Sequence, residues 1–307
     1  MRQVDKRRGF LGWAYRGPTI DNAVLSDARQ LVKRFLQKAP LNESCLIFDG
    51  PGIGLGTPLF VLSLLGKRRL DALKAIHFLS GSSFAPLWFY AKNEGQLLLT
   101  PENVANYYSQ NQRDRGVKPV VTLLVSVGRK LRGAKWVHPN VFLEDCLRPT
   151  LSQSFLRRPI GEWPANVHFW TYDKVSKRFI DLTARGEYPR LPTSKLVCAT
   201  AAIGGLFEPL YYEGAAFIDA ILAPGIKEHL KQLRAQSTNN LICHMYRSGE
   251  KANNLFLKLH SDRFAYRRLG WDYFIWLAGL KNREVGETLR VGLFELKPQR
   301  HSPSKWY

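Results

Sequence analysis

A chain of 307 residues with 45% hydrophobic residues is long enough for one large globular domain with an ample core. Its 45 Lys and Arg against 25 Asp and Glu give a net charge of +20, which attracts polyanions such as nucleic acid or anionic lipid headgroups. The basic residues are scattered, however, and no zinc-finger spacing, helix-turn-helix or RNA-binding signature accompanies them, so nucleic acid is not an expected partner.

The cysteines and the hydrophobic runs exclude further classes of protein. Cys45, Cys146, Cys198 and Cys243 form no C-x-x-C pair, so we expect no zinc site and buried free thiols in a reducing compartment. The apolar stretch 9–15 is too short for the core of a signal peptide, and no run of about 18 apolar residues could span a bilayer. These features predict a cytoplasmic protein whose only membrane contact is peripheral.

The first hundred residues alternate between helical and strand patterns. Helical spacing of apolar residues predicts a helix over 21–37, which Pro40 ends. Short apolar runs predict buried strands at 44–48 and 75–79, and apolar helices follow them at 58–65 and 84–92. A strand, a tight turn of small residues and a helix, twice in succession, is typical of a parallel α/β sheet.

The remaining elements are less regular. Residues 100–165 carry the weakest strand signals and are expected to form a helical flap beside the site. Beyond them, we predict paired strands at 167–170 and 178–182, a basic helix at 226–236 and a strand at 241–246. The expected organisation is a single domain over 1–307, with a core at about 45–245, an N-terminal helical extension over 1–40, and a C-terminal completion and polar tail over 246–307.

A glycine-rich stretch, 49–56, lies between the first predicted strand and the following helix. It lacks the Gly-Lys-Ser/Thr of a phosphate-binding P-loop, and Leu55 and Thr57 occupy positions where a dinucleotide fingerprint needs glycine. What remains is a run of backbone N–H groups beside a helix N-terminus, which suits an anion or a developing oxyanion. The alternative is a loop whose glycines only allow tight packing.

Ser83 is the candidate nucleophile. The run Gly81-Ser82-Ser83-Phe84-Ala85 fits G-x-S-x-[GA], in which small neighbours allow the sharp strand-to-helix turn of a nucleophile elbow. Gly81 and Ala85 would provide that room.

Asp219 is the candidate base. It lies between Ile218 and Ala220 in an apolar stretch, where a carboxylate needs a partner or has a raised pKa. A raised pKa suits a general base that works near neutral pH. The alternative is an aspartate that only caps a turn.

These segments, taken in order, resemble those of the patatin-like phospholipases over about residues 45–245. The similar blocks are Asp49 to Leu55 (the D-G-G-G-x-[RK]-G oxyanion loop), Gly81 to Ala85 (G-x-S-x-G), Thr171 to Phe179, Ala199 to Pro209, and Glu213 to Asp219. The resemblance implies an α/β fold, namely a patatin-like three-layer sandwich with a mostly parallel central sheet and helices on both faces.

The resemblance also implies an activity. It predicts a lipid acyl hydrolase of the phospholipase A or lysophospholipase type, in which Asp219 takes the proton of Ser83 and an acyl-Ser83 intermediate forms. The oxyanion would be bound by backbone N–H groups at Gly50, Gly52, Ile53 and Gly54, without a metal or a cofactor. The substrate would be an acyl-ester lipid, and the positive charge favours peripheral contact with an anionic membrane.

Three departures from the family pattern keep alternatives open. Gly54 replaces the basic residue of the loop, Pro51 has no N–H to donate, and Ala220-Ile221 replaces the two glycines after the aspartate. These changes also fit an acyltransferase on the same dyad or a degenerate patatin-like binding protein. A Ser–Asp–His triad is a further alternative, because His244 and His260 follow Asp219 in the chain.

Overall fold

The computed structural model describes residues 22–48, 56–94, 99–100, 128, 131–133, 140–145, 147–148, 150–204, 207–244, 254–259 and 291–292. The described strands are β1 (Ser44–Phe48), β2 (Ala75–Leu79), β3 (Val167–Asp173), β4 (Arg178–Leu182), β5 (Leu210–Tyr212), β6 (Ala215–Asp219), β7 (Asn239–His244), β8 (Asn254–Leu259) and β9 (Val291–Gly292). The described α-helices are α1 (Asn22–Lys38), α2 (Gly56–Leu65), α3 (Lys67–Ala72), α4 (Phe84–Glu94), α7 (Val141–Asp145), α8 (Gln153–Arg157), α9 (Thr193–Thr200) and α10 (Ile226–Ala235). Short 3-10 turns are η1 (Leu41–Glu43), η3 (Ser80–Ser83), η4 (Ile160–Glu162) and η5 (Ala220–Leu222).

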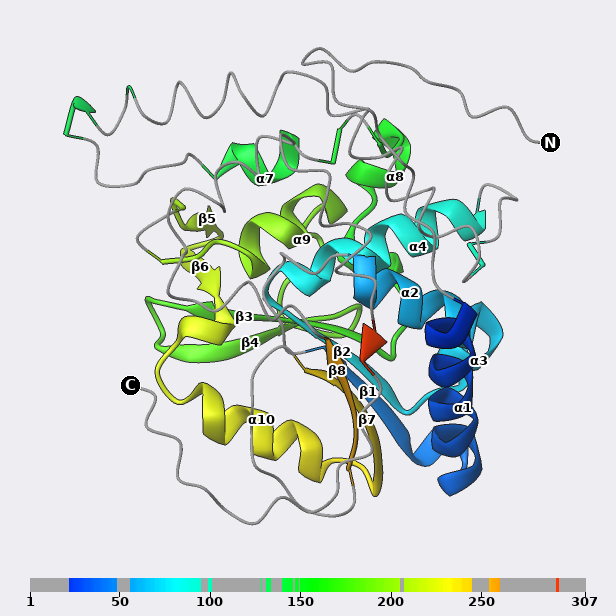
Figure 1. The fold of residues 1–307 in the computed structure, drawn as a ribbon. Helices are drawn as coiled ribbons and strands as arrows, with labels where there is room; N and C mark the ends of the chain where they lie inside the picture. The colour runs from blue at the N-terminus through cyan, green and yellow to red at the C-terminus, as the bar shows by residue number, and fades with distance from the viewer. Residues whose placement is uncertain are drawn as a thin grey trace.

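All the described strands belong to one mixed sheet (Figure 1). Its centre is parallel, because β3, β2, β1, β7 and β8 lie side by side in that order and run in the same direction. Antiparallel strands complete the two ends: β4 and β6 pair with β3, β5 pairs with β6, and β9 pairs with β8. The chain is therefore an α/β protein with a parallel core and antiparallel margins.

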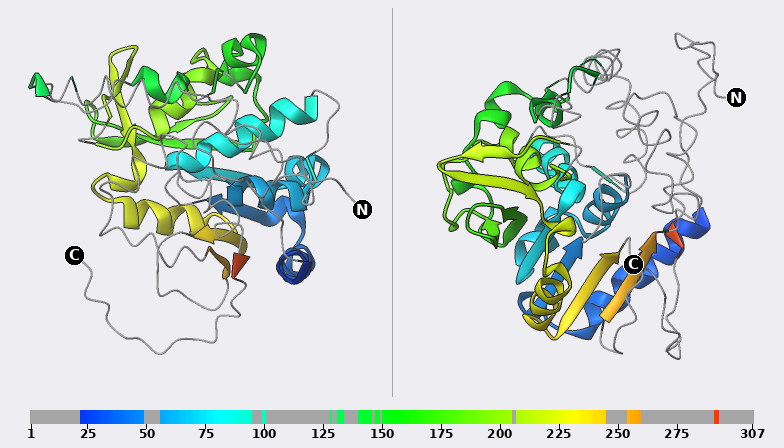
Figure 2. Two further views of the ribbon diagram at one scale, coloured as in Figure 1. Left: turned by 45° about the horizontal axis from the view of Figure 1, so that its top comes forward. Right: turned by 90° about the vertical axis from the view of Figure 1, so that its left-hand side faces the viewer.

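Helices cover both faces of this sheet (Figures 1 and 2). One face packs against α2, α4, α8 and α9 through a large core that includes Phe48, Ile76, Phe78 and Phe169. The other face packs against α10, where Ile47, Leu79 and Ile242 meet Leu233. Neighbouring residues of a strand point to opposite faces of the sheet. Because helices cover both faces, β1 and β2 are buried along their whole length.

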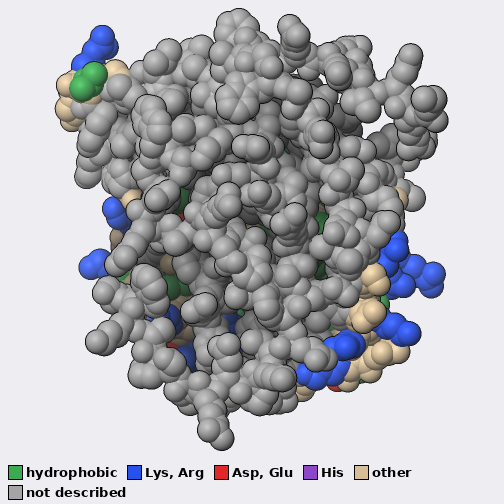
Figure 3. Space-filling view, viewed as in Figure 1, with side chains coloured by type: hydrophobic (Ala, Val, Ile, Leu, Met, Phe, Trp, Pro, Cys, Tyr) green, Lys and Arg blue, Asp and Glu red, His purple; other side chains and the backbone are tan. Residues whose placement is uncertain are grey.

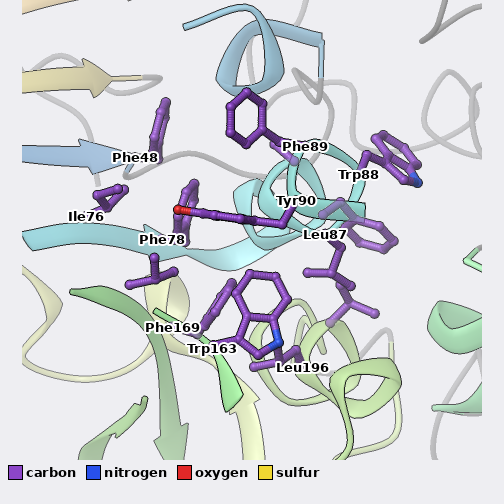
Figure 4. Close-up of a cluster of buried hydrophobic side chains, with 14 of the residues drawn as sticks. Phe48, Ile76, Phe78, Leu87, Trp88, Phe89, Tyr90, Trp163, Phe169 and Leu196 are labelled. Atoms are coloured by element: carbon purple, nitrogen blue, oxygen red, sulfur yellow. The ribbon is translucent and has the colours of Figure 1, made fainter. Parts of the chain in front are cut away.

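Aromatic side chains fill the larger core (Figure 4). Phe48 and Phe78 stack with ring centroids 4.9 Å apart, and Trp163 meets Phe169 edge to face at 5.2 Å. Trp88, Phe89 and Tyr90, which follow the predicted nucleophile in the sequence, are all buried here. These three residues bury α4 on several sides within the larger core, which holds the turn before α4 in place.

Most predicted elements are present, with shifts at their ends. The predicted strands at 44–48, 75–79 and 178–182 have the observed bounds, while β3 is longer than predicted and includes Asp173. The strand predicted at 241–246 begins two residues earlier, and the predicted pattern did not identify β5, β6 or α9. Cys45 and Cys198 are free buried thiols, as expected. Among the described helices, none combines the length and the apolar character needed to cross a bilayer.

Candidate active site

Two strands end against each other on one edge of β3. β2 runs parallel to β3, and its last residue, Leu79, pairs with Trp170. β6 runs antiparallel to β3 along the same edge, and its last residue, Asp219, pairs with Thr171. Since Trp170 and Thr171 are consecutive, the carboxyl ends of β2 and β6 meet head to head. The residue after Leu79 is thereby brought to Asp219.

That residue is Ser80, and its backbone is strained. Its φ is 59°, in the left-handed region that side chains other than glycine rarely adopt. It lies at the point where β2 ends and η3 begins, and η3 leads directly into α4. A strained strand-to-helix turn that holds a serine at its apex is the geometry of a nucleophile elbow.

The side chains of Ser80 and Asp219 are hydrogen-bonded. The Ser80 hydroxyl donates to Oδ2 of Asp219 at 2.5 Å, across 139 residues of sequence. The other carboxylate oxygen, Oδ1, accepts the backbone N–H of Ile221 at 2.9 Å and so caps η5. Asp219 therefore caps a turn, which is the alternative considered from the sequence. It does so with one carboxylate oxygen, while the other binds Ser80.

Burial sets the protonation of Asp219. The carboxyl group has no exposed surface, and desolvation raises its pKa from 3.8 to about 7, although the hydrogen bonds from Ser80 and from the Ile221 N–H act in the opposite direction. Its backbone N–H donates to the Ala202 carbonyl oxygen at 3.0 Å. The group can thus exchange a proton near neutral pH while its backbone stays anchored.

Ser83, the nucleophile predicted from the sequence, lies elsewhere. It is fully buried at the end of η3, and its hydroxyl donates to the Ser80 carbonyl oxygen at 2.8 Å. Among the described residues, the acceptor of the Ser83 hydroxyl is this carbonyl and not Asp219, so the predicted Ser83–Asp219 contact is replaced by Ser80–Asp219. The physical reason is that the elbow begins directly after β2, three residues before Ser83. Gly81 lies inside the turn and Ala85 in the first turn of α4, next to it as predicted.

Ser82 joins this turn to the neighbouring strand. Its hydroxyl donates to the Leu79 carbonyl oxygen at 2.6 Å and approaches the Phe48 carbonyl oxygen at 3.3 Å. Phe48 is the last residue of β1, so the carboxyl end of β1 lies beside the Ser80 turn. The predicted oxyanion residues Gly50, Gly52, Ile53 and Gly54 themselves lie outside the described residues.

The histidines of the triad alternative are not placed at this site. The backbone of His244 ends β7, while its side chain and the whole of His260 lie outside the described part of the chain. The sequence reasoning missed a different group of histidines, His77, His168 and His229, on the α10 face of the sheet. For His77 and His168 the available signal was their alternation with core residues along β2 and β3, whereas His229 lies on α10. Within the described residues, no group of His, Cys, Asp and Glu side chains is arranged to hold a metal ion.

Basic side chains are prominent on the described surface. In the space-filling view, Lys and Arg side chains gather on the flank that carries α1 and α3 (Figure 3). These side chains contribute to the net charge of +20.

Comparisons with known proteins add no relative. No family model matches the chain, and no curated protein sequence is similar to it at a significant level. Interpretation of the site therefore depends on its own geometry.

Proposed function

We propose that this chain is a serine acyl hydrolase in which Ser80 is the nucleophile and Asp219 its base. The observation that carries the proposal is the 2.5 Å hydrogen bond between the strained Ser80 and the fully buried Asp219. A hydroxyl held against a carboxylate whose pKa is about 7 can be deprotonated as it attacks, with no histidine between them.

The proposed bond changes involve these two side chains, the ester and water. As Ser80 Oγ bonds to the ester carbonyl carbon, its proton passes to Oδ2 of Asp219 and the carbonyl oxygen becomes an oxyanion. When the intermediate collapses, the alkoxide leaves and takes that proton, and acyl-Ser80 remains. Water then attacks the carbonyl carbon of acyl-Ser80 and gives a proton to Asp219. When this second intermediate collapses, the fatty acid leaves, and Ser80 Oγ takes the proton back from Asp219.

Backbone N–H groups are proposed to bind the oxyanion. The N–H of Gly81, the residue after the nucleophile, is one proposed donor, as in other nucleophile elbows. The others are in the glycine-rich stretch, at Gly50, Gly52, Ile53 and Gly54. This stretch follows β1 in the sequence, and the last residue of β1, Phe48, lies beside the Ser80 turn. Each such donor typically lowers the barrier by about 2.7–4 kcal/mol.

The proposed substrate is an acyl-ester lipid, and the proposed fold is the patatin-like arrangement. The support for the fold is the parallel centre of the sheet, covered by helices on both faces, with a serine turn after one strand. The support for a lipid surface as partner is the net charge of +20, since each basic residue near an anionic bilayer adds around 1 kcal/mol of attraction.

A fluorophosphonate probe tests the nucleophile directly. We expect one covalent adduct, which peptide mass spectrometry places on Ser80. Ser80→Ala removes the adduct, whereas Ser83→Ala weakens labelling but keeps the adduct on Ser80. Because the site is enclosed, labelling also reports that it opens to a ligand.

Lipid profiling then tests the substrate class. Mixed liposomes are incubated with the wild-type protein and with Ser80→Ala, and the lipids are compared by mass spectrometry. Free fatty acid that appears only with the wild type supports hydrolysis, and a new acyl ester supports acyl transfer. An adduct on Ser83, or no adduct on either serine in folded protein, overturns the proposal.

A further inference from the structure

Thr171 occupies the point on β3 where β2 gives way to β6. Its neighbour Trp170 pairs with Leu79 of β2, and Thr171 itself pairs with Asp219 of β6. The side chain of Thr171 is fully buried. It lies with Phe169 on the face that packs against α2, α4, α8 and α9, because alternate residues of β3 share a face.

The Thr171 hydroxyl contacts two backbone carbonyl oxygens. One belongs to Ala199 in α9, at 2.7 Å, and the other to Ile218 in β6, at 2.8 Å. A threonine hydroxyl has a single proton to donate, so the two carbonyls share it. The hydroxyl therefore ties α9 to the end of β6.

The Ile218 carbonyl is half of the peptide group that leads into Asp219. The other half, the Asp219 N–H, donates to the Ala202 carbonyl oxygen at 3.0 Å. Because a peptide group is planar, holding its C=O and its N–H fixes the plane of the group and the position of the Asp219 Cα at its end. The Asp219 side chain extends from this Cα, so that position affects how well Oδ2 meets the Ser80 hydroxyl.

We propose that Thr171 is a positioning residue that aims the Asp219 carboxylate at Ser80. The inference rests on the proposed function, because it assigns a role within the same site. Thr171 reaches no reacting atom, and it acts through the Ile218–Asp219 peptide group. A displacement of about 1 Å in a reacting group can slow a reaction by around a hundredfold. Loss of this hydroxyl can therefore lower the rate although it touches no reacting atom.

The test compares Thr171→Val with Thr171→Ser. Valine keeps the shape and removes the hydroxyl, and we expect kcat for ester hydrolysis to fall roughly ten- to a hundredfold with KM little changed. Serine keeps the hydroxyl, and we expect it to restore kcat to within a few-fold of wild type. The rising limb of the pH–rate profile should also move to higher pH in the valine variant, because a weaker Ser80 hydrogen bond lowers the pKa of Asp219 less.

Thr193→Val is the matched control. Thr193 is equally buried at the other end of α9. Its hydroxyl also has two partners, because it donates to the Arg158 carbonyl oxygen at 2.7 Å and accepts the indole N–H of Trp163 at 2.9 Å. A purely structural loss should lower thermal stability in both valine variants but leave the pH limb unmoved. The proposal is overturned if Thr171→Val and Thr193→Val have the same kcat and the same pH–rate profile. It is also overturned if Thr171→Ser does not restore kcat.

Two further variants keep the result interpretable. If Thr171→Val does not fold, Thr171→Ala is measured against Thr193→Ala, because alanine puts no methyl group against the two carbonyl oxygens. Full activity in Ser80→Ala would reject the proposed nucleophile, whereas loss in Ser80→Ala together with wild-type kinetics in Thr171→Val rejects only the role of Thr171.

Discussion

The side chains of Ser80 and Asp219 are joined by a hydrogen bond although 139 residues separate them in the chain. The sheet makes this contact, because β2 and β6 approach each other along one edge of β3 and end at consecutive positions. Ser80 directly follows the last paired residue of β2, and Asp219 is the last paired residue of β6. A polar pair is thereby held at the boundary of an apolar core, where burial adjusts the pKa of the acid.

Replacing Asp219 with Asn should remove the base and keep the shape of the side chain. We expect fluorophosphonate labelling of Ser80 to slow by roughly 10²–10⁴-fold, the usual contribution of a positioned general base. Asp173→Asn is the matched control. Asp173 is also buried, but its carboxylate binds the N–H groups of Val175, Ser176 and Ala216 and holds a hairpin turn. That variant should lose stability and still label, and equal labelling rates in the two variants would contradict the role of Asp219.

Much of this fold could be predicted from the sequence, because the central strands carry a strong local signal. β1 and β2 are short apolar runs flanked by breakers, and their bounds were predicted correctly. β6 was missed because Ala215 and Ala216 have weak strand propensity, and the strand is specified by pairing with the distant β3. Long-range pairing of this kind leaves little trace in a local pattern.

The candidate site shows the same division between local and distant information. Asp219 was identified because a carboxylate in an apolar run is conspicuous, and its raised pKa agrees with the expectation. The G-x-S-x-[GA] match selects Ser83, while in the structure the serine that meets Asp219 is Ser80, at the start of the turn directly after Leu79. The two serines differ in backbone and partners: Ser80 has a left-handed φ and donates to Asp219, whereas Ser83 donates to the Ser80 carbonyl oxygen. A local motif carries no information about such a long-range contact.

The pH dependence of the reaction should follow the ionisation of Asp219. The base must be charged to accept a proton, and burial raises its pKa to about 7. We therefore expect kcat/KM to rise with pH through about 7 and to fall about tenfold per pH unit well below it. Stopped-time hydrolysis of a soluble ester between pH 5 and pH 9 measures this limb. A rate independent of pH across that range would rule out Asp219 as the base.

Ser80→Gly should give a more stable protein than Ser80→Ala. Both changes remove the hydroxyl and leave Asp219 without that partner, so the comparison isolates the backbone. At a φ of 59° a side chain costs about 1–2 kcal/mol that glycine does not incur. We expect the free energy of unfolding in urea to be about 1 kcal/mol higher for the glycine variant.

The same pair of substitutions at Lys177 calibrates the Ser80 comparison. Lys177 has a φ of 56° in an exposed hairpin turn, far from the proposed chemistry. Glycine should exceed alanine in stability there by a similar amount. An alanine variant at Ser80 that equals or exceeds the glycine variant would show that the turn is not strained.

His229 should make the protein sensitive to acid. Its ring lies between Trp170, edge to face at 4.3 Å, and Phe179, stacked at 4.2 Å, and attaches α10 to the sheet. Burial lowers its pKa from 6.5 to about 4, so the unfolded chain binds a proton that the folded protein rejects. The stability from neutral His229 is complete above pH 6.5 and is lost as the pH falls toward 4, with about 2 kcal/mol gone at pH 5.

His229→Phe keeps an aromatic ring in this position and removes the titration. Asp219 has the opposite sign, because its raised pKa adds stability as the pH falls below about 7, and it contributes equally to the wild type and the variant. The difference between the two proteins therefore reports His229 together with a smaller contribution from His77, whose pKa His229 helps to lower. Urea unfolding at pH 8 and pH 5 should show that the wild type loses about 2 kcal/mol relative to the variant on acidification. An equal loss of unfolding free energy in the two proteins on acidification would mean that His229 is not held neutral between α10 and the sheet.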